Sequence, residues 1–411
     1  MALLVQKFGG TSVADPDRIR EVARQVAAAR KRGDQIVLVV SAMGKETDEL
    51  LRVAHAVSST RPGREMDMLI TTGERKACAL VCMALADLGV PADSFTGSQA
   101  GFITDGIHQN ARIREIRPDR IREAVAAGRV PVVAGSQGVS VDRDVTFLGR
   151  GGSDTTAVAL AQVLDADACE LYTDVSGVFT TDPRVVPDAR KMSRVTFDEL
   201  LEMTATGCPK PAMRSVEVAR AYGVTLHVRS AFTWERGTIV SEEDSSMEKA
   251  IIRAVTHEVD QAKVTISGVP DQPGVAANVF RTLADVDVNV DMIVQNVSDQ
   301  GVTDISFTVP RGQIDAVTAA AAGLVEAIGA KDTSFDETIA LVSLIGAGMK
   351  TNPGVAAKMF ETLADAGINL EMISTSPIRI SCVVDESDAE RSIQLLHAAF
   401  ELHLAPEDRS V

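Results

Sequence analysis

The chain is poor in aromatic residues and in cysteines. Aromatic side chains make up 4% of its 411 residues, so Val, Leu, Ile and Ala must supply the bulk of any core. Its five cysteines are odd in number and widely spaced, which argues against a disulfide framework in a chain of this length. Cys78 and Cys82 would share one helix face, but no histidine lies near them. We therefore expect buried thiols, and neither a zinc site nor another resident metal.

Positive charge and long apolar runs are also scarce. The formal net charge is -16 at pH 7, which argues against nucleic acid or an anionic membrane as a main partner, because both favour a basic surface. The opening MALLVQKFGG has neither a basic segment nor an apolar run of signal-peptide length, and no segment is long enough to span a membrane. We expect a cytoplasmic protein that binds anions through a few local cations.

The first half of the chain alternates strand-like runs with helical periodicity. LLVQKF, IVLVVSA, VPVVAG and ACELYTDV indicate strands, and RIREVARQVAAAR indicates a helix. This alternation predicts a largely parallel, buried sheet between layers of helices. Glycine-rich or polar runs follow the strands: KFGGTSV, SAMGKETDEL, GSQG and TDVSGVFTTDPR. Since such sheets bind ligands at the carboxyl ends of their strands, these runs predict where the site lies.

One glycine-rich turn leads directly into a helical pattern, in LGRGGSDTTAVALAQVL from Leu148 to Leu164. A helix that begins at such a turn presents free backbone N–H groups at the positive end of its dipole, which suits an anion. Arg150 adds a guanidinium that pairs with carboxylates and phosphates. Taken alone, the stretch is equally compatible with an ordinary turn in which Ser153 or Asp154 caps the helix.

A lysine near the end of the first strand precedes a pair of glycines, in KFGGTSV. Lys7 suits neutralisation of phosphate oxygens during transfer, and Gly9 and Gly10 let a ligand approach closely. The Walker A pattern GxxxxGK[ST] is absent. Taken alone, the motif would be better interpreted as an exposed lysine before a turn.

The second half contains an internal repeat after a polar run, SEEDSSMEK from Ser241, that indicates a linker. VTISGVPDQPGVAANVFRTLADVDVNVDMI from Val264 resembles VSLIGAGMKTNPGVAAKMFETLADAGINLEMIS from Val342. Each copy has the pattern strand, turn, helix, strand, and further strand-like sequence follows it, DISFTV or IRISCVV. Two long copies predict duplicated small α+β domains and not a solenoid.

Four segments together resemble one known family. KFGGTSV, TTGER, GRGGSDTTA and YTDVSGVFTTDPR with the following RSVEVAR are similar to motifs of the aspartate kinases of the amino-acid kinase superfamily, and the repeats resemble their paired ACT domains. The resemblance implies an α/β fold, a three-layer α/β/α sandwich followed by two ferredoxin-like βαββαβ ACT domains. It implies a kinase domain at residues 1–245 and ACT domains at 246–337 and 338–411, or an interleaved pair.

The resemblance also implies a reaction, the phosphorylation of the side-chain carboxylate of L-aspartate by ATP with Mg²⁺, on the route to lysine, threonine and methionine. That carboxylate is ionised at pH 7, so catalysis reduces to alignment and charge neutralisation. ACT domains imply lysine, threonine or both as effectors and a homo-oligomer paired through these domains. In some relatives a shorter regulatory subunit exists, which would start near Met247 here.

Matching motif positions assigns roles to single residues. Lys7 would bridge the transferred phosphoryl group, and Asp154 would help hold the substrate amino group and order the site. Aspartate would contact Ser41, Thr47, Glu74 through its ammonium, Arg150 through a carboxylate, and Ser153. The nucleotide would contact Lys7, Gly9, Gly10, Thr173, Asp174, Phe179, Asp182, Arg184 and Lys210. Effector positions would be Asp271, Gly274, Ala276, Asn289, Gln295 and Asn296 in the first copy and Asn369, Met372 and Ile373 in the second.

Some of these assignments have structural alternatives. Asp182 and Arg184 also fit a simple turn that starts at Asp-Pro, and Asn289 and Asn369 also fit loops before strands. In GCPKPAMRSVEVAR the chain departs from the family, whose nucleotide-site lysine would match Pro209. Two prolines disfavour a strand, so we expect an irregular loop from which Lys210 still reaches the phosphates. The departure keeps two alternatives open, a kinase-like amino-acid sensor and a related kinase with another substrate.

Overall fold

The computed structural model describes residues 2–242, 252–296, 301–347, 349, 352 and 354–409. Contacts divide them into two compact units. The first comprises residues 2–178, 191–204 and 209–242, and the second comprises 179–190, 205–208 and the described residues from 252 onward. Most of the expected linker and the expected start at Met247 lie outside the described residues. No helix in the described ranges is long and apolar enough to cross a membrane.

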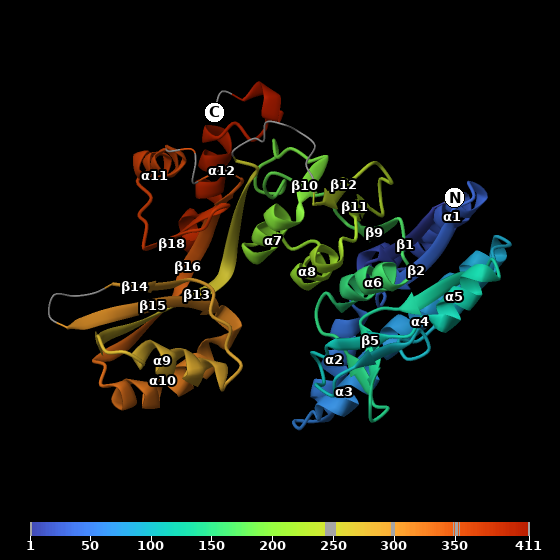
Figure 1. Ribbon diagram of the computed structural model, residues 1–411, viewed down its shortest axis with the longest axis horizontal. Helices are drawn as coiled ribbons and strands as arrows, with labels where there is room; N and C mark the ends of the chain where they lie inside the picture. Colours follow the sequence, from blue (N-terminus) through green and yellow to red (C-terminus); the bar gives the residue numbers. More distant parts are fainter. Residues whose placement is uncertain are drawn as a thin grey trace. The chain divides into compact units, whose positions relative to one another are not determined.

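An eight-stranded sheet forms the centre of the first unit (Figure 1). Neighbouring strands are parallel except for β11 (Leu226–Ser230) and β12 (Thr238–Ser241), and β1 (Leu3–Phe8) lies between β2 (Gln35–Val40) and β9 (Ala168–Thr173). The largely parallel sheet and all four strands expected from the sequence are thereby confirmed. The strand order is β10 (Arg194–Thr196), β12 (Thr238–Ser241), β11 (Leu226–Ser230), β9 (Ala168–Thr173), β1 (Leu3–Phe8), β2 (Gln35–Val40), β6 (Val130–Ala134) and β3 (Ala92–Phe95).

Helices cover both faces of this sheet. Phe8 and Leu38 pack with Val22 of α1 (Pro16–Lys31) and Val81 of α4 (Thr72–Asp87). Successive strand residues point to opposite faces, so Lys7 faces away from these helices and toward α6 (Gly152–Val163), which packs on β1, β2 and β9. The three-layer α/β/α arrangement is confirmed. The other helices of this unit are α2 (Glu46–Val57), α3 (Gly63–Ile70), α5 (Asp119–Ala126), α7 (Phe197–Ala205) and α8 (Met213–Tyr222).

A smaller sheet connects the end of β6 to the start of α6. Its strand order is β5 (Ile113–Ile116), β4 (Phe102–Thr104), β7 (Gln137–Ser140) and β8 (Val145–Phe147). The hydroxyls of Thr104 and Thr146 form a buried hydrogen bond of 2.7 Å inside it. Because β8 ends just before the glycine-rich turn at residues 148–151, this sheet sets the position of that turn.

The second unit is built on a six-stranded antiparallel sheet. The strand order is β14 (Ile293–Gln295), β15 (Val302–Pro310), β13 (Ala254–Pro270), β16 (Asp332–Ile345), β18 (Arg379–Asp385) and β17 (Met372–Thr375). The long strands β13 and β16 pair with each other in two stretches. Residues 261–267 pair with residues 332–339, and residues 254–258 pair with residues 341–345.

Each repeat has its own helices and its own apolar core. In the first, α9 (Val275–Ala284) lies beside α10 (Ile314–Ile328), as Figure 1 shows, and Val264, Val279 and Phe307 belong to one buried cluster. In the second, α11 (Val355–Asp365) packs on α12 (Ala389–Ala399), and Val342 and Leu363 belong to another. The duplicated small α+β domains predicted from the sequence are confirmed.

Candidate active site

A pocket of about 570 Å³ in the first unit lies at the carboxyl ends of β1, β2 and β9. The sheet continues from β1 to β2 on one side and to β9 on the other, and α/β sheets bind ligands where the strand order reverses in this way. Motifs far apart in the sequence therefore meet in one place. The predicted residues that line the pocket are Lys7, Gly9, Gly10, Ser41, Thr47, Glu74, Arg150, Ser153, Asp154, Thr173, Asp174 and Lys210.

A buried ion pair joins β1 to α6 in this pocket. Lys7 Nζ lies 2.6 Å from Asp154 Oδ1, and the two side chains are 8% and 7% exposed. Burial opposes ionisation of Asp154, but the charge and hydrogen bond of Lys7 outweigh it and hold the pKa of Asp154 below its usual value. The backbone N–H of Ala212 donates to the other carboxylate oxygen at 3.2 Å. Asp154 is thus an ionised carboxylate that fixes the ammonium group of Lys7.

The turn before α6 has the conformation that its glycines allow. Gly149 and Gly151 have φ angles of 86° and 71°, in the left-handed region where other residues are disfavoured. Gly151 is the N-cap and has no side-chain capping bond. The alternative that Ser153 or Asp154 caps the helix is therefore wrong, because both lie within the first turn and line the pocket. Arg150, between the two glycines, also lines the pocket and is exposed.

Glu74 is a buried carboxylate at the start of α4, with 4% of its surface exposed. Its pKa is raised to about 7, mainly by desolvation and also by the nearby Glu46 carboxylate, while the N–H groups of Glu74 and Ala42 and the charge of Arg75 act in the opposite direction. Within the described residues no donor reaches Glu74 Oε2. A buried carboxylate of this kind in a pocket favours a cationic ligand group such as an ammonium.

The residues predicted to hold the nucleotide divide into two sets. Thr173 and Asp174, at the end of β9, line the pocket, and the Thr173 hydroxyl donates to Asp174 Oδ1 at 2.9 Å. Phe179, Asp182 and Arg184 belong to the second unit and are not among the pocket-lining residues. There Asp182 accepts a hydrogen bond from the Arg184 backbone N–H at 2.8 Å and pairs with its guanidinium. This contact forms the simple turn that was given as the structural alternative for Asp182 and Arg184. The nucleotide role of Phe179, Asp182 and Arg184 stays a prediction.

The segment that departs from the family pattern contains neither helix nor strand between α7 and α8. The irregular loop expected from its prolines is thereby confirmed. Lys210 lines the pocket, and its charge contributes to the lowered pKa of Asp154. The displaced lysine therefore lies on the same side of the sheet as Lys7, and its contact with phosphates stays a prediction.

Several further pocket residues were not predicted from the sequence, among them Ser136, Gln109 and Phe147. Ser136 directly follows β6 within the run GSQG, so the strand-end rule indicated its neighbourhood without naming it. Gln109 and Phe147 come from the loop after β4 and from the end of β8. Neither belongs to a motif, and only the smaller sheet brings them to the pocket.

The predicted effector residues of the second unit lie on loops, on edge strands and, for Ala276, in the first turn of α9. Gly274 is the N-cap of α9 with a φ of 95°, and the Asn289 N–H donates to the side chain of Gln313 at 3.1 Å. Met372 is buried in an apolar cluster, whereas its neighbour Ile373 is 45% exposed. Gln295 and the pair Met372 and Ile373 lie on β14 and β17, the two edge strands of the sheet. Edge strands have unpaired backbone groups that a second chain can extend.

The comparisons with known proteins agree with this architecture. Residues 2–230 match the amino acid kinase family, and residues 264–322 and 342–400 match the ACT domain. The chain is 53% identical over 407 residues to an aspartokinase of Mycolicibacterium smegmatis, covering 98% of this chain and 97% of the relative.

Solved structures share the fold. E. coli aspartokinase III in complex with aspartate and ADP aligns with a TM-score of 0.85 at 24% identity, over 97% of this chain and 100% of that one. The complex of the same enzyme with lysine and aspartate aligns with a TM-score of 0.75 at 25% identity, over 96% of this chain and 99% of that one. The first unit thus has an amino acid kinase fold, and the second contains the ACT domains. The chain belongs to the aspartokinase family, as its motifs indicated.

Proposed function

We propose that this chain transfers the γ-phosphoryl group of ATP to the side-chain carboxylate of L-aspartate and forms 4-phospho-L-aspartate. The observation that carries the proposal is the pocket in which the Lys7–Asp154 pair, Glu74 and Arg150 lie together. Glu74 suits the substrate ammonium and Arg150 suits its α-carboxylate. An amino acid held at both of these groups presents its side-chain carboxylate to the phosphate side of the pocket.

The chemistry needs positioning and charge neutralisation. A carboxylate oxygen of aspartate forms a bond to the γ-phosphorus while the bond from that phosphorus to the bridging oxygen breaks and ADP leaves. The nucleophile is already ionised, so no general base is required. Lys7, held in place by Asp154, donates N–H groups toward the phosphoryl oxygens as charge moves between donor and acceptor.

Several groups in the pocket support the proposed binding of ATP and Mg²⁺. Lys7 and Lys210 supply positive charge for phosphate oxygens, and the exposed carboxylate of Asp174 with the Thr173 hydroxyl supplies the oxygen ligands that Mg²⁺ prefers. When bound, Mg²⁺ would neutralise phosphate charge and help orient the transferred group. The ADP complex of E. coli aspartokinase III supports a nucleotide on this fold.

A sensor that binds an amino acid without phosphorylating it is the alternative function. Such a sensor would not require a buried lysine beside the phosphate position, so the Lys7–Asp154 pair favours the kinase function over the sensor function. The test is turnover of ATP with aspartate, glutamate or acetylglutamate as acceptor, with hydroxylamine trapping the acyl phosphate. Hydroxamate from aspartate alone supports the proposal. Equal or greater yields from another acceptor, or none from any, would contradict it.

We propose that lysine, threonine or both bind at the ACT domains as effectors and that the chain forms a homo-oligomer. The regulated reaction would be a step toward lysine, threonine and methionine. The lysine complex of E. coli aspartokinase III supports this proposal, and a shorter regulatory subunit starting near Met247 belongs to the same hypothesis. We expect millimolar lysine plus threonine to lower the initial rate at subsaturating aspartate. An unchanged rate, with no heat of binding for either amino acid in calorimetry, would count against it.

Lys210 is expected to contribute to ATP binding in spite of its displacement. Lys210→Ala should raise the KM for ATP by about tenfold, since one charge-assisted contact to phosphate contributes about 1.5 kcal/mol or more. Pro209→Lys should lower that KM, because it restores a lysine at the position that the family uses. The measurement is the KM for ATP at saturating aspartate. If Lys210→Ala leaves both KM and kcat unchanged, this segment supplies no lysine to the nucleotide.

A further inference from the structure

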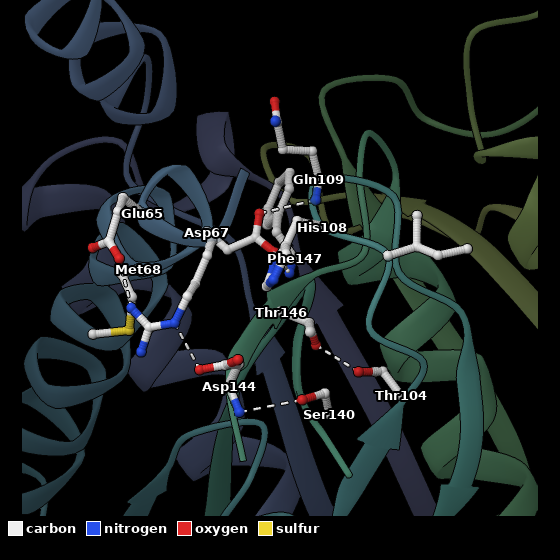
Figure 2. A network of polar contacts seen from close by, with 12 residues as sticks. Glu65, Asp67, Met68, Thr104, His108, Gln109, Ser140, Asp144, Thr146 and Phe147 are labelled. Atoms are coloured by element: carbon white, nitrogen blue, oxygen red, sulfur yellow. Dashed lines mark hydrogen bonds and ion pairs between the residues drawn. The ribbon is translucent and has the colours of Figure 1, made fainter. Parts of the chain in front are cut away.

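Asp67 on α3 is a fully buried carboxylate outside the groups assigned above, with 0% of its surface exposed. Figure 2 shows two separate segments meeting it. Its Oδ1 accepts a hydrogen bond from the backbone N–H of Gln109 at 3.0 Å. Its Oδ2 accepts one from the N–H of Phe147 at 3.0 Å and lies 2.8 Å from His108 Nδ1. Burial raises the pKa of Asp67, and these donors oppose that rise.

The two segments that Asp67 holds form part of the pocket wall. Gln109 and Phe147 both line the pocket, and their segments are joined by a hydrogen bond from Ala111 N–H to the Phe147 carbonyl at 2.9 Å. The Gln109 carbonyl lies so close to Gly149 that a Cβ there would approach it to 3.2 Å. Gly149 directly precedes Arg150. The position of the Gln109 segment therefore restricts where the loop that carries Arg150 can lie.

Gln109 itself has a left-handed φ of 66°. That conformation is unfavourable for a residue other than glycine and persists only where its surroundings hold it. The hydrogen bond that its N–H donates to Asp67 supplies such a restraint. In Figure 2 the Gln109 side chain extends away from Asp67.

The backbone of Asp67 also contacts the junction of α3 and α4 that precedes Glu74. Its backbone carbonyl accepts hydrogen bonds from the N–H of Thr71 at 3.2 Å and from the Thr71 hydroxyl at 2.8 Å. Thr71 is the residue at which α3 ends and α4 begins, and Glu74 follows in the first turn of α4. The same residue therefore contacts the helix junction before Glu74 and the segments beside Arg150.

We propose that Asp67 is a positioning residue for the amino-acid substrate, fixing the Arg150 loop and Gln109 relative to Glu74. The inference rests on the proposed function, because it assumes that these groups bind aspartate. Asp67→Asn leaves one acceptor oxygen for donors that now use both oxygens. We expect it to raise the KM for aspartate about tenfold, with kcat within about threefold and the KM for ATP within about twofold of wild type. Asp67→Ala should raise the KM for aspartate further.

The experiment is steady-state kinetics with hydroxylamine trapping on the full chain, together with thermal unfolding of each variant. Asp144→Asn is the matched control: Figure 2 shows Asp144 in the same region as Asp67, but it is partly exposed and accepts from Arg64 at 2.8 Å near the surface. We expect its KM for aspartate to equal that of wild type.

A selective rise in the KM for aspartate in Asp67→Asn, absent from Asp144→Asn, supports the inference. A lowered Tm with an unchanged KM for aspartate would overturn it, since Asp67 would then only stabilise the fold. An equal rise in both KM values would also overturn it. Asp67→Asn keeps the test valid if Asp67→Ala does not fold. Absence of aspartyl hydroxamate from wild type would instead refute the proposed function, so the two failures are distinguishable.

Discussion

Replacing Lys7 with alanine is expected to lower kcat by at least about a hundredfold, while the KM for aspartate changes by less than about threefold. The side chain lies in the pocket with its ammonium 2.6 Å from Asp154 and faces the side where phosphate is expected. Loss of one preorganised contact to charge in the transition state typically costs about 3 kcal/mol. The measurement is kcat and both KM values at saturating co-substrate.

The same substitution removes the partner of a buried carboxylate, which by itself can destabilise a protein by about 3–5 kcal/mol. A double variant, Lys7→Met with Asp154→Asn, separates the two effects because it removes both charges and leaves neither buried alone. We expect the double variant to unfold at a higher temperature than Lys7→Ala and still to lack activity. If it regains turnover near that of wild type, the lysine has only a structural role.

The sequence predicted the parts of the site that depend on strand ends. Lys7 lies near the end of a strand-like run and Asp154 follows a glycine turn, and both patterns are local. A parallel sheet brings such strand ends to one edge, so their meeting in one pocket followed from the fold class. The ion pair between the two residues did not follow, because it depends on how α6 packs on the face of β1 toward which Lys7 points.

Other parts of the site depend on contacts that leave no local signal. Asp67 occurs in an ordinary helical stretch, GREMDMLI, and its burial results from the smaller sheet packing on α3. Gln109 lies in a loop whose conformation is held by that distant carboxylate. The pairing of β13 with β16 along both repeats was likewise not visible in the repeat pattern, since periodicity indicates a strand but not its partner.

Glu74→Gln is expected to lower kcat/KM for aspartate by about a hundredfold above pH 8, with little change in the KM for ATP. The amide removes the charge that would pair with the substrate ammonium, and a charge-assisted contact in a buried site contributes about 1.5–3 kcal/mol. The carboxylate has 4% exposure and an oxygen without a donor among the described residues. An unchanged kcat/KM for aspartate would remove Glu74 from substrate binding.

The pH dependence gives the same residue a second, independent test. Because burial raises the pKa of Glu74 to about 7, the residue is largely protonated at pH 6 and ionised at pH 8. Binding of an ammonium requires the ionised form, so the KM for aspartate should fall as pH rises through about 7 in wild type and stay flat in Glu74→Gln. Glu46→Gln is the matched control. Removing that neighbouring negative charge, which raises the pKa of Glu74, should move the midpoint to lower pH.

Stability should change in the opposite direction from substrate binding. The folded-state pKa of Glu74 lies above its ordinary value of 4.5. The favourable contribution of Glu74 to the free energy of unfolding is therefore complete below pH 4.5 and is lost as pH rises through about 7. At pH 8 wild type therefore buries an ionised carboxylate that Glu74→Gln does not. We expect the Tm of the variant, relative to wild type, to increase between pH 5 and pH 8. A Tm difference that is constant across this range would mean that Glu74 does not titrate there, and the expected pH dependence of aspartate binding would then have no basis in this residue.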